Sequence, residues 1–179
     1  SFPTRRSSDL PFLSDFLDAL ASALSAHDYD LLVATVADGE PETEVFRRLV
    51  AARKCAGFVL TNSRDDDPRI TLLQEMKVPF VVYGRANVAD DYAHLDMDNA
   101  AGLAGMVDHL AALGHQRFAY LDLSEQATFA RLRRQGFDAG IARNSVAQDQ
   151  VAYVSVPHTS AGGQTAVARL FDGGDSHRP

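Results

Sequence analysis

The sequence predicts an α/β fold in which parallel sheets are flanked by helices. Short apolar runs, typical of buried strands, alternate along the chain with longer segments whose apolar residues recur every three or four positions, the period of a helix. Strands that are separated by helices pair in parallel through right-handed crossovers. With 46% hydrophobic residues among 179, the chain can build a core as one ordinary domain or two small lobes.

The first half of the chain shows this alternation from its first helix onward. The segment 11–24 opens with a proline, which suits a first helical turn, and its apolar residues have helical spacing. The run 29–36 has the continuous apolar character of a buried strand, and the turn residues of 37–41 end it. A second helix is expected at 45–50 and a second strand at 57–61.

The same alternation continues to the end of the chain. A polar loop leads to a short helix whose first residue is Pro68. Asp98 and Asn99 are suited to cap a later helix, and Gly114 is suited to end it. The remaining expected strands are 78–83, 93–97, 117–121 and 150–156, and the remaining helices are 68–76, 100–113, 128–143 and 160–171.

Charge and cysteine content limit the classes of function. The net charge of −7 argues against a nucleic-acid-binding surface within this segment. No apolar run approaches the roughly 18–20 residues of a membrane span. Cys55 is the only cysteine, so the chain can form no internal disulfide, and a reducing cytoplasm is permitted.

The first ten residues stand apart from this pattern. Residues 1–10 resemble the in-frame translation of a common sequencing adapter, and they lack the apolar segment of a targeting signal. We therefore expect 1–10 to be a non-native, adapter-derived segment that takes no part in the fold. The alternative is a natural basic N-terminal arm.

The middle of the chain carries three motifs in a fixed order. An Asp-Asn pair follows a strand, a Leu-Gly-His triplet closes the next helix, and an Arg-x-x-Gly-Phe motif lies in the helix after the following strand. These motifs are Asp98-Asn99, Leu113-Gly114-His115 and Arg133-x-x-Gly136-Phe137. Their order and spacing resemble the effector-binding domain of LacI/GalR-type transcriptional regulators, over roughly the segment 11–179.

This resemblance implies a two-lobed, periplasmic-binding-protein-like fold. Its lobes are expected at 11–97, without the first strand, and at 98–179. The chain stops where members of this family continue with a further strand, so we expect an incomplete second lobe and a fragment truncated at both ends. The resemblance also implies a cytoplasmic homodimer that represses transcription through an N-terminal helix-turn-helix bound to operator DNA, a domain that this sequence does not contain. Effector binding between the lobes would shift their closure.

The resemblance also points to the ligand site. Ligands of open α/β sheets bind beyond the carboxyl ends of the strands, and those ends are polar here. Arg133 matches the family position where an arginine holds the effector, although Arg131 and Arg134 are close enough for the register to slip. An apolar wall with Arg, Asn and Ser suits a sugar or sugar derivative, and a nucleobase is the other class that the family allows. The expected ligand-binding residues are Phe12, Leu13, Asn62, Ser63, Arg64, Arg85 and Arg133.

Catalytic and metal-binding interpretations find little support. His94, Asp96 and Asp98 alternate along a strand-like stretch, but a lone histidine with two carboxylates falls short of a committed metal site. Ser124 has no nucleophile elbow around it, and the sequence has no phosphate-binding glycine loop. We expect no enzyme activity, no cofactor and no metal.

Two other functions share the expected architecture. A periplasmic sugar-binding protein of an ABC-type uptake system would be exported and monomeric. An enzyme on a doubly wound sheet is the third class. The Leu-Gly-His and Arg-x-x-Gly-Phe motifs favour the regulator, whereas analogy of fold alone does not separate it from the uptake protein.

Overall fold

A computed structural model describes residues 11–37, 39–88, 91–123, 127–157 and 159–172 of the chain. The chain divides into two compact units, Ser1–Cys55 and Ala56–Pro179. The expected adapter-derived segment 1–10 and Ser124 lie outside the described residues. The expected lobes, 11–97 and 98–179, follow a different division of the chain and remain a prediction.

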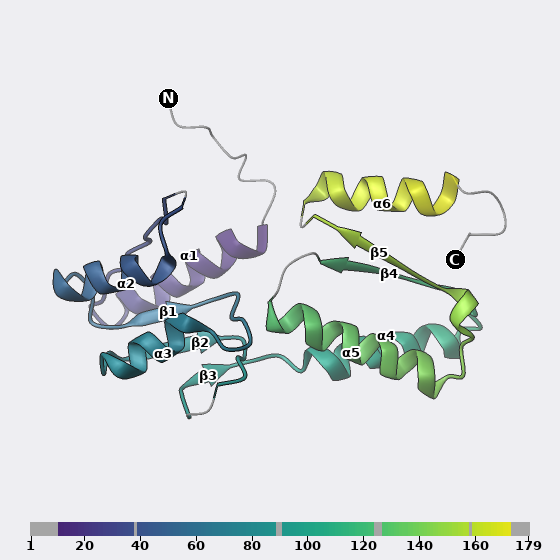
Figure 1. Ribbon diagram of the computed structural model, residues 1–179, viewed down its shortest axis with the longest axis horizontal. Helices are drawn as coiled ribbons and strands as arrows, with labels where there is room; N and C mark the ends of the chain where they lie inside the picture. Colours follow the sequence, from purple (N-terminus) through teal and green to yellow (C-terminus); the bar gives the residue numbers. More distant parts are fainter. Residues whose placement is uncertain (1–10, 38, 89–90, 124–126, 158, 173–179) are drawn as a thin grey trace. The chain divides into compact units, whose positions relative to one another are not determined.

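Two helices form the regular structure among the described residues of the first unit (Figure 1). α1 (Pro11–Ser25) confirms the helix predicted at 11–24, and α2 (Glu42–Ala51) confirms the helix predicted at 45–50. Glutamates lie in the first turn of α2 and Arg48 lies in its last turn, so both ends carry the charge that stabilises a helix dipole.

The strand predicted at 29–36 is wrong. These residues form no ladder with any other described residue, and Tyr29, Leu32 and Val33 are 56%, 53% and 62% exposed. A strand needs a partner edge for its N–H and C=O groups, and a buried strand needs a covering layer on each face. The apolar run shows only that its side chains favour burial, because partner edges come from distant parts of a chain.

The second unit begins with a sheet of three parallel strands. β1 (Phe58–Leu60), β2 (Phe80–Tyr83) and β3 (His94–Leu95) lie in the order β1-β2-β3. α3 (Pro68–Glu75) connects β1 to β2, as the predicted crossover requires. The structure thus confirms the strands predicted at 57–61, 78–83 and 93–97, with shorter ladders.

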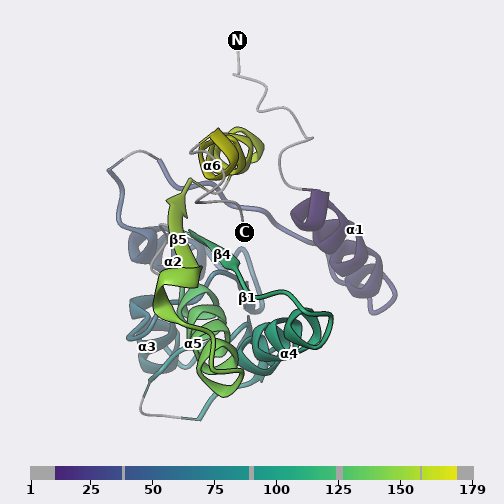
Figure 2. The ribbon, with the colours of Figure 1, turned by 90° about the vertical axis from the view of Figure 1, so that its right-hand side faces the viewer.

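A second parallel sheet follows in the same unit. β4 (Phe118–Leu123) pairs with β5 (Val151–Val156). α4 (Asn99–Ala112) and α5 (Thr128–Arg143) lie on one side of these strands, and α6 (Ser160–Asp172) lies on the other (Figures 1 and 2). Parallel strands flanked by helices confirm the predicted α/β class.

An aromatic and aliphatic cluster forms the core between β4 and its two helices. Phe118 and Tyr120 of β4 pack with Phe137 and Ile141 of α5 and Val107 of α4, and none of the five is more than 9% exposed. The ring centroids of Tyr120 and Phe137 lie 4.8 Å apart. Because burial of one large apolar side chain contributes about 1.5–3 kcal/mol, this cluster fixes α5 on the sheet.

The ends of α4 agree with the sequence in part. Oδ1 of Asp98 accepts a hydrogen bond from the backbone N–H of Ala101 at 2.8 Å, as a helix cap does. Gly114 follows the helix with a φ of +90°, in the left-handed region that favours glycine. The Asn99 side chain does not cap the helix, and instead donates to the carbonyl of Met97 at 3.0 Å.

The close approach of α4 and α5 explains the glycine of the Arg-x-x-Gly-Phe motif. A Cβ atom on Gly136 would clash with the backbone carbonyl of Ala100, and one on Gly140 would lie 2.7 Å from Cβ of Val107. Glycine therefore lets the two helices pack without displacement of the backbone. This contact also fixes the rotation of α5, and hence which of its side chains face each direction.

Gly136→Ala is expected to destabilise the protein by about 1–3 kcal/mol, the usual cost of overpacking a close contact. The added methyl group would force α4 and α5 apart. Urea unfolding followed by circular dichroism measures the change in the free energy of unfolding.

Gly102→Ala is the matched control, because it lies on α4 with no neighbouring atom within 4 Å of the added Cβ. This substitution should stabilise the protein by about 0.5–1 kcal/mol, since alanine loses less backbone entropy than glycine in a helix. Equal effects of the two substitutions would contradict a tight contact at Gly136.

Candidate functional site

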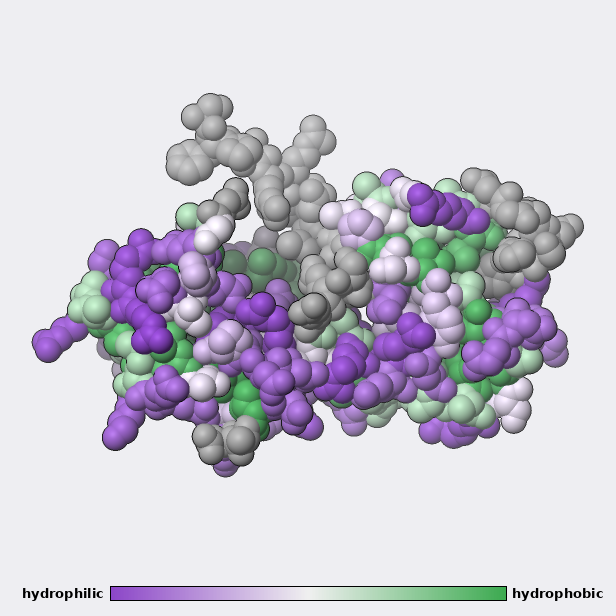
Figure 3. Space-filling view, in the orientation of Figure 1, coloured by the Kyte–Doolittle hydropathy of each residue, from purple (hydrophilic) through white to green (hydrophobic). Residues whose placement is uncertain are grey.

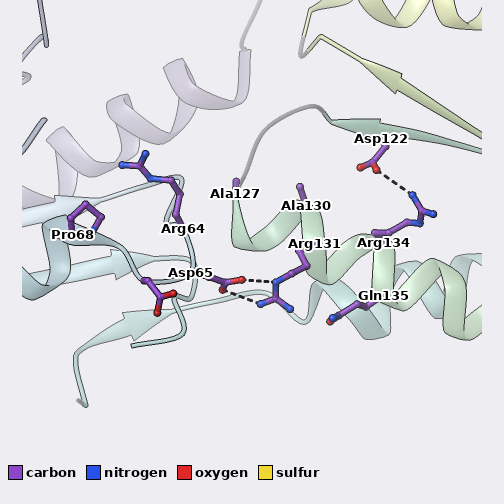
Figure 4. A pocket seen from close by; sticks show the side chains of 10 residues that line it. Arg64, Asp65, Pro68, Asp122, Ala127, Ala130, Arg131, Arg134 and Gln135 are labelled. Carbon is purple, nitrogen blue, oxygen red and sulfur yellow. Dashed lines mark hydrogen bonds and ion pairs between the residues drawn. The ribbon is translucent and has the colours of Figure 1, made fainter. Parts of the chain in front are cut away.

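A cavity of about 620 Å³ lies beyond the carboxyl end of β1, between the loop that follows this strand and the first turns of α5 (Figure 4). Its volume falls within the range of about 300–1,000 Å³ that is typical of small-molecule sites. In Figure 3 hydrophilic side chains predominate along the exposed face of α5, whereas hydrophobic side chains gather between α6 and the strands beneath it. The lining residues are Arg64, Asp65, Asp66, Pro68, Asp122, Ala127, Ala130, Arg131, Arg134 and Gln135.

A buried carboxylate shapes the loop after β1. Asp67 is fully buried and caps α3: it accepts from the backbone N–H groups of Arg64 (3.1 Å) and Arg69 (3.0 Å), and from the Arg69 guanidinium (2.6 Å). Burial alone would raise the pKa of Asp67, but these hydrogen bonds and the charge of Arg69 outweigh burial and lower it from its ordinary value. Asn62 and Asp66 adopt positive φ angles of 51° and 56°, which Asn and Asp tolerate better than most residues.

A bidentate ion pair joins this loop to α5 (Figure 4). The two carboxylate oxygens of Asp65 accept from Nε and Nη2 of Arg131 at 2.6 and 3.0 Å, and one of them also accepts from Oγ1 of Thr128 at 3.1 Å. The backbone N–H of Thr128 donates to the carbonyl of Ser63 at 2.9 Å. The Arg131 guanidinium, through its hydrogen bond above all, holds the pKa of Asp65 below its ordinary value. We call Asp65, Thr128 and Arg131 the clamp.

A second arginine of α5, Arg134, is held by three neighbours. Its Nη1 lies 3.3 Å from Oδ2 of Asp122, and its Nε donates to both oxygens of Asp138 at 3.1 Å. Its Cζ lies 3.7 Å from the ring centroid of Tyr153, a cation–π contact. Burial would lower the pKa of Arg134, but the hydrogen bond and charge of Asp138 outweigh burial, so the pKa is raised and the side chain stays cationic.

Three of the predicted site residues lie in the loop after β1, and one of them lines the cavity. That residue is Arg64. Ser63 is 3% exposed, and its Oγ donates to the carbonyl of Arg85 at 2.7 Å, so it ties the end of β1 to the end of β2. The carbonyl of Asn62 accepts from the Arg69 guanidinium at 3.2 Å.

The motif arginine Arg133 lies outside the cavity lining. Its Nε donates to Oδ1 of Asn99 at 2.9 Å, and its guanidinium lies over the Phe129 ring, 4.9 Å from the centroid. Arg131 and Arg134, the neighbours that the sequence left open as alternatives, line the cavity instead. Which of these arginines contacts a ligand stays a prediction.

The other predicted residues are not among those that line this cavity. Nε of Arg85 lies 3.5 Å from Oδ2 of Asp96. Phe12 and Leu13 lie on α1 in the first unit, 61% and 39% exposed, whereas the cavity belongs to the second unit. The prediction that these residues contact a ligand therefore stays a prediction.

The sequence prediction missed four polar cavity residues: Asp65, Asp66, Asp122 and Gln135. In the sequence, the two loop aspartates precede a helix that begins at Pro68, where acidic side chains are favourable without any ligand. Asp122 lies at the polar end of β4, so the rule that ligands bind beyond strand ends was the signal that could have found it. Gln135 lies four residues after Arg131, on the same face of α5. Only the observed rotation of α5 shows that this face lines the cavity.

Two further findings concern metals and membranes. Across the described stretches of the chain, no group of three or more His, Cys, Asp or Glu side chains could hold a metal ion, and Asp96, from the His94–Asp98 stretch, lies instead beside the Arg85 guanidinium. Within the same stretches, no helix has both the length and the apolar character that a membrane crossing requires.

Comparisons with known proteins agree on one family. The family described as periplasmic binding proteins and sugar binding domain of LacI family matches residues 5–174. The chain is 32% identical over 168 residues to the HTH-type transcriptional regulator RafR of Escherichia coli, which covers 91% of this chain and 49% of that protein. It is 31% identical to the HTH-type transcriptional regulator AglR of Rhizobium meliloti, over 92% of this chain and 46% of that protein. The chain thus spans about half the length of these curated relatives.

Solved structures share the fold. A regulatory protein of the LacI family from Chloroflexus aggregans superposes with a TM-score of 0.78 at 27% identity, over 93% of this chain and 59% of that chain. A LacI family transcriptional regulator from Bifidobacterium animalis superposes with a TM-score of 0.80 at 23% identity, over 92% of this chain and 60% of that chain.

Acidification is expected to weaken the fold through Asp65 and Asp67. Both carboxyl groups have a lowered pKa in the folded protein, whereas an aspartate of an unfolded chain titrates near about 3.9. Their contribution to the free energy of unfolding is therefore complete above that unfolded value and is lost as the pH falls through the lowered folded values. Urea unfolding at a series of pH values from about 6 to about 2 measures the loss.

Asp67→Asn is expected to lower the free energy of unfolding at neutral pH by about 3 kcal/mol, because it leaves the charge of Arg69 without its buried partner. It should also flatten the dependence of stability on acid pH. Asp149→Asn, at an exposed aspartate, is the control and should change neither. A wild-type pH dependence in Asp67→Asn would contradict the assigned role of this carboxylate.

Proposed function

The chain belongs to the family of periplasmic binding proteins and LacI-type sugar-binding domains, and we propose that it is the sugar-sensing domain of a DNA-binding transcriptional regulator. Membership of this family confirms the resemblance indicated by the Asp-Asn, Leu-Gly-His and Arg-x-x-Gly-Phe motifs. In this proposal a sugar enters the cavity at the end of β1, and its binding shifts the balance between open and closed arrangements of two lobes.

The lining of the cavity is the observation that carries the sugar proposal. Three arginines and three aspartates line it, so their formal charges balance. A neutral ligand with many hydroxyl groups suits this lining, since carboxylates accept hydrogen bonds and guanidinium groups donate them. An anionic ligand would meet as many repulsive charges as attractive ones.

A regulator is favoured over a sugar-binding protein of an ABC-type uptake system. The matching family includes periplasmic binding proteins, but the curated relatives are HTH-type transcriptional regulators. We therefore propose a cytoplasmic homodimer that acts as a repressor and binds operator DNA through a helix-turn-helix domain of the kind these relatives are named for. No enzymatic role is proposed.

The ligand-contact residues of this proposal have two kinds of support. Arg64, Arg131 and Arg134 are supported by their place in the cavity lining. In the proposed two-lobed arrangement, 11–97 and 98–179 each supply one side of the site. The residues that rest on the family resemblance alone are Phe12, Leu13, Asn62, Ser63, Arg85 and Arg133.

Isothermal titration calorimetry tests the ligand class. The chain is expected to bind at least one of glucose, galactose, cellobiose, maltose and raffinose, because each offers several hydroxyl groups to the balanced charges of the lining. Hypoxanthine, a nucleobase, and citrate, an anion, are expected to give no heat of binding. Binding of hypoxanthine alone, or of none of the sugars, would contradict the proposal.

The family resemblance assigns Arg133 to the ligand, although this side chain does not line the cavity. On that assignment, Arg133→Ala is expected to weaken sugar binding by about 1.5–3 kcal/mol, the range for a hydrogen bond to a charged group. Arg143→Ala is the matched control on the same helix, because Arg143 pairs with Asp108 and the family resemblance gives it no ligand contact. An unchanged calorimetric affinity for Arg133→Ala would contradict a ligand contact by Arg133 and leave only its structural contact with Asn99.

A further inference from the structure

Arg134 contacts side chains of two strands and of its own helix. Its Cζ lies 3.7 Å from the ring centroid of Tyr153 on β5 and 5.7 Å from that of Tyr120 on β4. Both oxygens of Asp138, one turn further along α5, accept from its Nε at 3.1 Å. Stacking on an aromatic ring and planar hydrogen bonding are geometries that arginine fits and lysine does not.

Tyr153 orders this arrangement from outside the cavity. Its hydroxyl donates to Oδ1 of Asp138 at 2.8 Å, so it contacts both the guanidinium group and the carboxylate that pairs with it. Tyr153 itself is not a lining residue. A mobile arginine side chain loses rotamer entropy when it binds a ligand. Tyr153 restricts the side chain before a ligand arrives, which is preorganisation.

The guanidinium group of Arg134 and the carboxylate of Asp122 place a hydrogen-bond donor beside an acceptor in the cavity wall. Nη1 of Arg134 lies 3.3 Å from Oδ2 of Asp122, and both residues line the cavity (Figure 4). Among the residues that the structure describes, Nη2 of Arg134 and Oδ1 of Asp122 have no hydrogen-bond partner. The two side chains are 35% and 30% exposed, so a ligand can reach them.

The other arginine of α5 that lines the cavity, Arg131, already uses two of its donor groups in an ion pair. Nε and Nη2 of Arg131 both donate to Asp65, so the clamp occupies one edge of that guanidinium group. Arg134 uses only Nη1 towards the cavity wall and keeps Nη2 for a further acceptor.

We propose that Asp122 and Arg134 form the specificity-determining pair of the site, that they bind two adjacent hydroxyl groups of the sugar, and that Tyr153 is the positioning residue that holds Arg134 for this contact. One hydroxyl group donates to Oδ1 of Asp122, and its neighbour accepts from Nη2 of Arg134. This inference rests on the proposed sugar-sensing function and deepens it, since it names a vicinal diol as the group recognised.

Calorimetric titration of the 179-residue chain tests the pair. The probes are glucose, galactose, cellobiose, maltose and raffinose, together with derivatives of glucose and galactose that each lack one hydroxyl group. Asp122→Asn and Arg134→Lys are each expected to lower the affinity at least about 10-fold, the loss of one hydrogen bond to a charged group. Asp122→Asn should also reduce the preference of the wild type for the parent sugar over the derivative that lacks a recognised hydroxyl, because a neutral amide oxygen is a weaker acceptor than a carboxylate oxygen. A purely structural role of the pair would leave that preference intact.

The positioning role of Tyr153 is tested by comparing a substitution that removes the aromatic ring with a conservative one that keeps it. Tyr153→Leu removes the ring and is expected to lower the affinity about 10-fold, whereas Tyr153→Phe keeps the ring over Arg134 and should stay within about 3-fold of the wild type. Thermal unfolding of both variants separates lost positioning from lost stability. Arg143→Lys, at an arginine of α5 that pairs with Asp108, is the matched control and should bind as the wild type does.

The outcomes separate this inference from the function on which it rests. A wild type that binds a sugar, with Asp122 and Arg134 variants that keep its affinity and its preference among the derivatives, would overturn the inference and leave sugar sensing in place. A wild type that binds none of the probes would overturn sugar sensing, and the inference with it.

Discussion

The clamp of Asp65, Thr128 and Arg131 is the interaction on which the site depends. It joins the loop after β1 to the first turns of α5, and the cavity lies between these two segments. The side chains of Arg131 and Asp65 are 44% and 36% exposed, so the ion pair contributes no more than about 1 kcal/mol after solvent screening. An ion pair of this strength links the two walls of the cavity, and it is weak enough for the binding of a ligand to change their relative stability.

Much of the fold could be predicted because helix periodicity is a local signal. The segments 100–113 and 128–143 became α4 and α5 almost unchanged. The strand predicted at 29–36 was wrong because a strand forms only beside a partner edge, and the local sequence pattern does not show whether such an edge is present. The motif glycine Gly136 was visible in the sequence, but its reason, the contact with Ala100 of α4, appears only once the two helices are packed.

The position of the candidate cavity was easier to predict than the residues that line it. The rule that ligands bind beyond strand ends led to the loop that holds Arg64, and this loop forms one wall of the cavity. Neighbouring residues of a helix point in directions about 100° apart. The choice between Arg133 and Arg134 therefore depends on the rotation of α5, which its packing on α4 sets. Ser63 shows a second reason why site residues are hard to predict. A polar residue at a strand end can form its hydrogen bond within the fold, as Ser63 does with the carbonyl of Arg85.

Amide hydrogen exchange, with and without the tightest-binding of the five sugars, tests most directly whether the two walls act as one ligand site. The clamp and the cavity lining predict that the sugar slows exchange in 61–68 and in 127–135 together, since one ligand contacts both segments. Slower exchange in only one of these segments, in neither of them, or only elsewhere in the chain would contradict a sugar site formed by the loop after β1 and the start of α5.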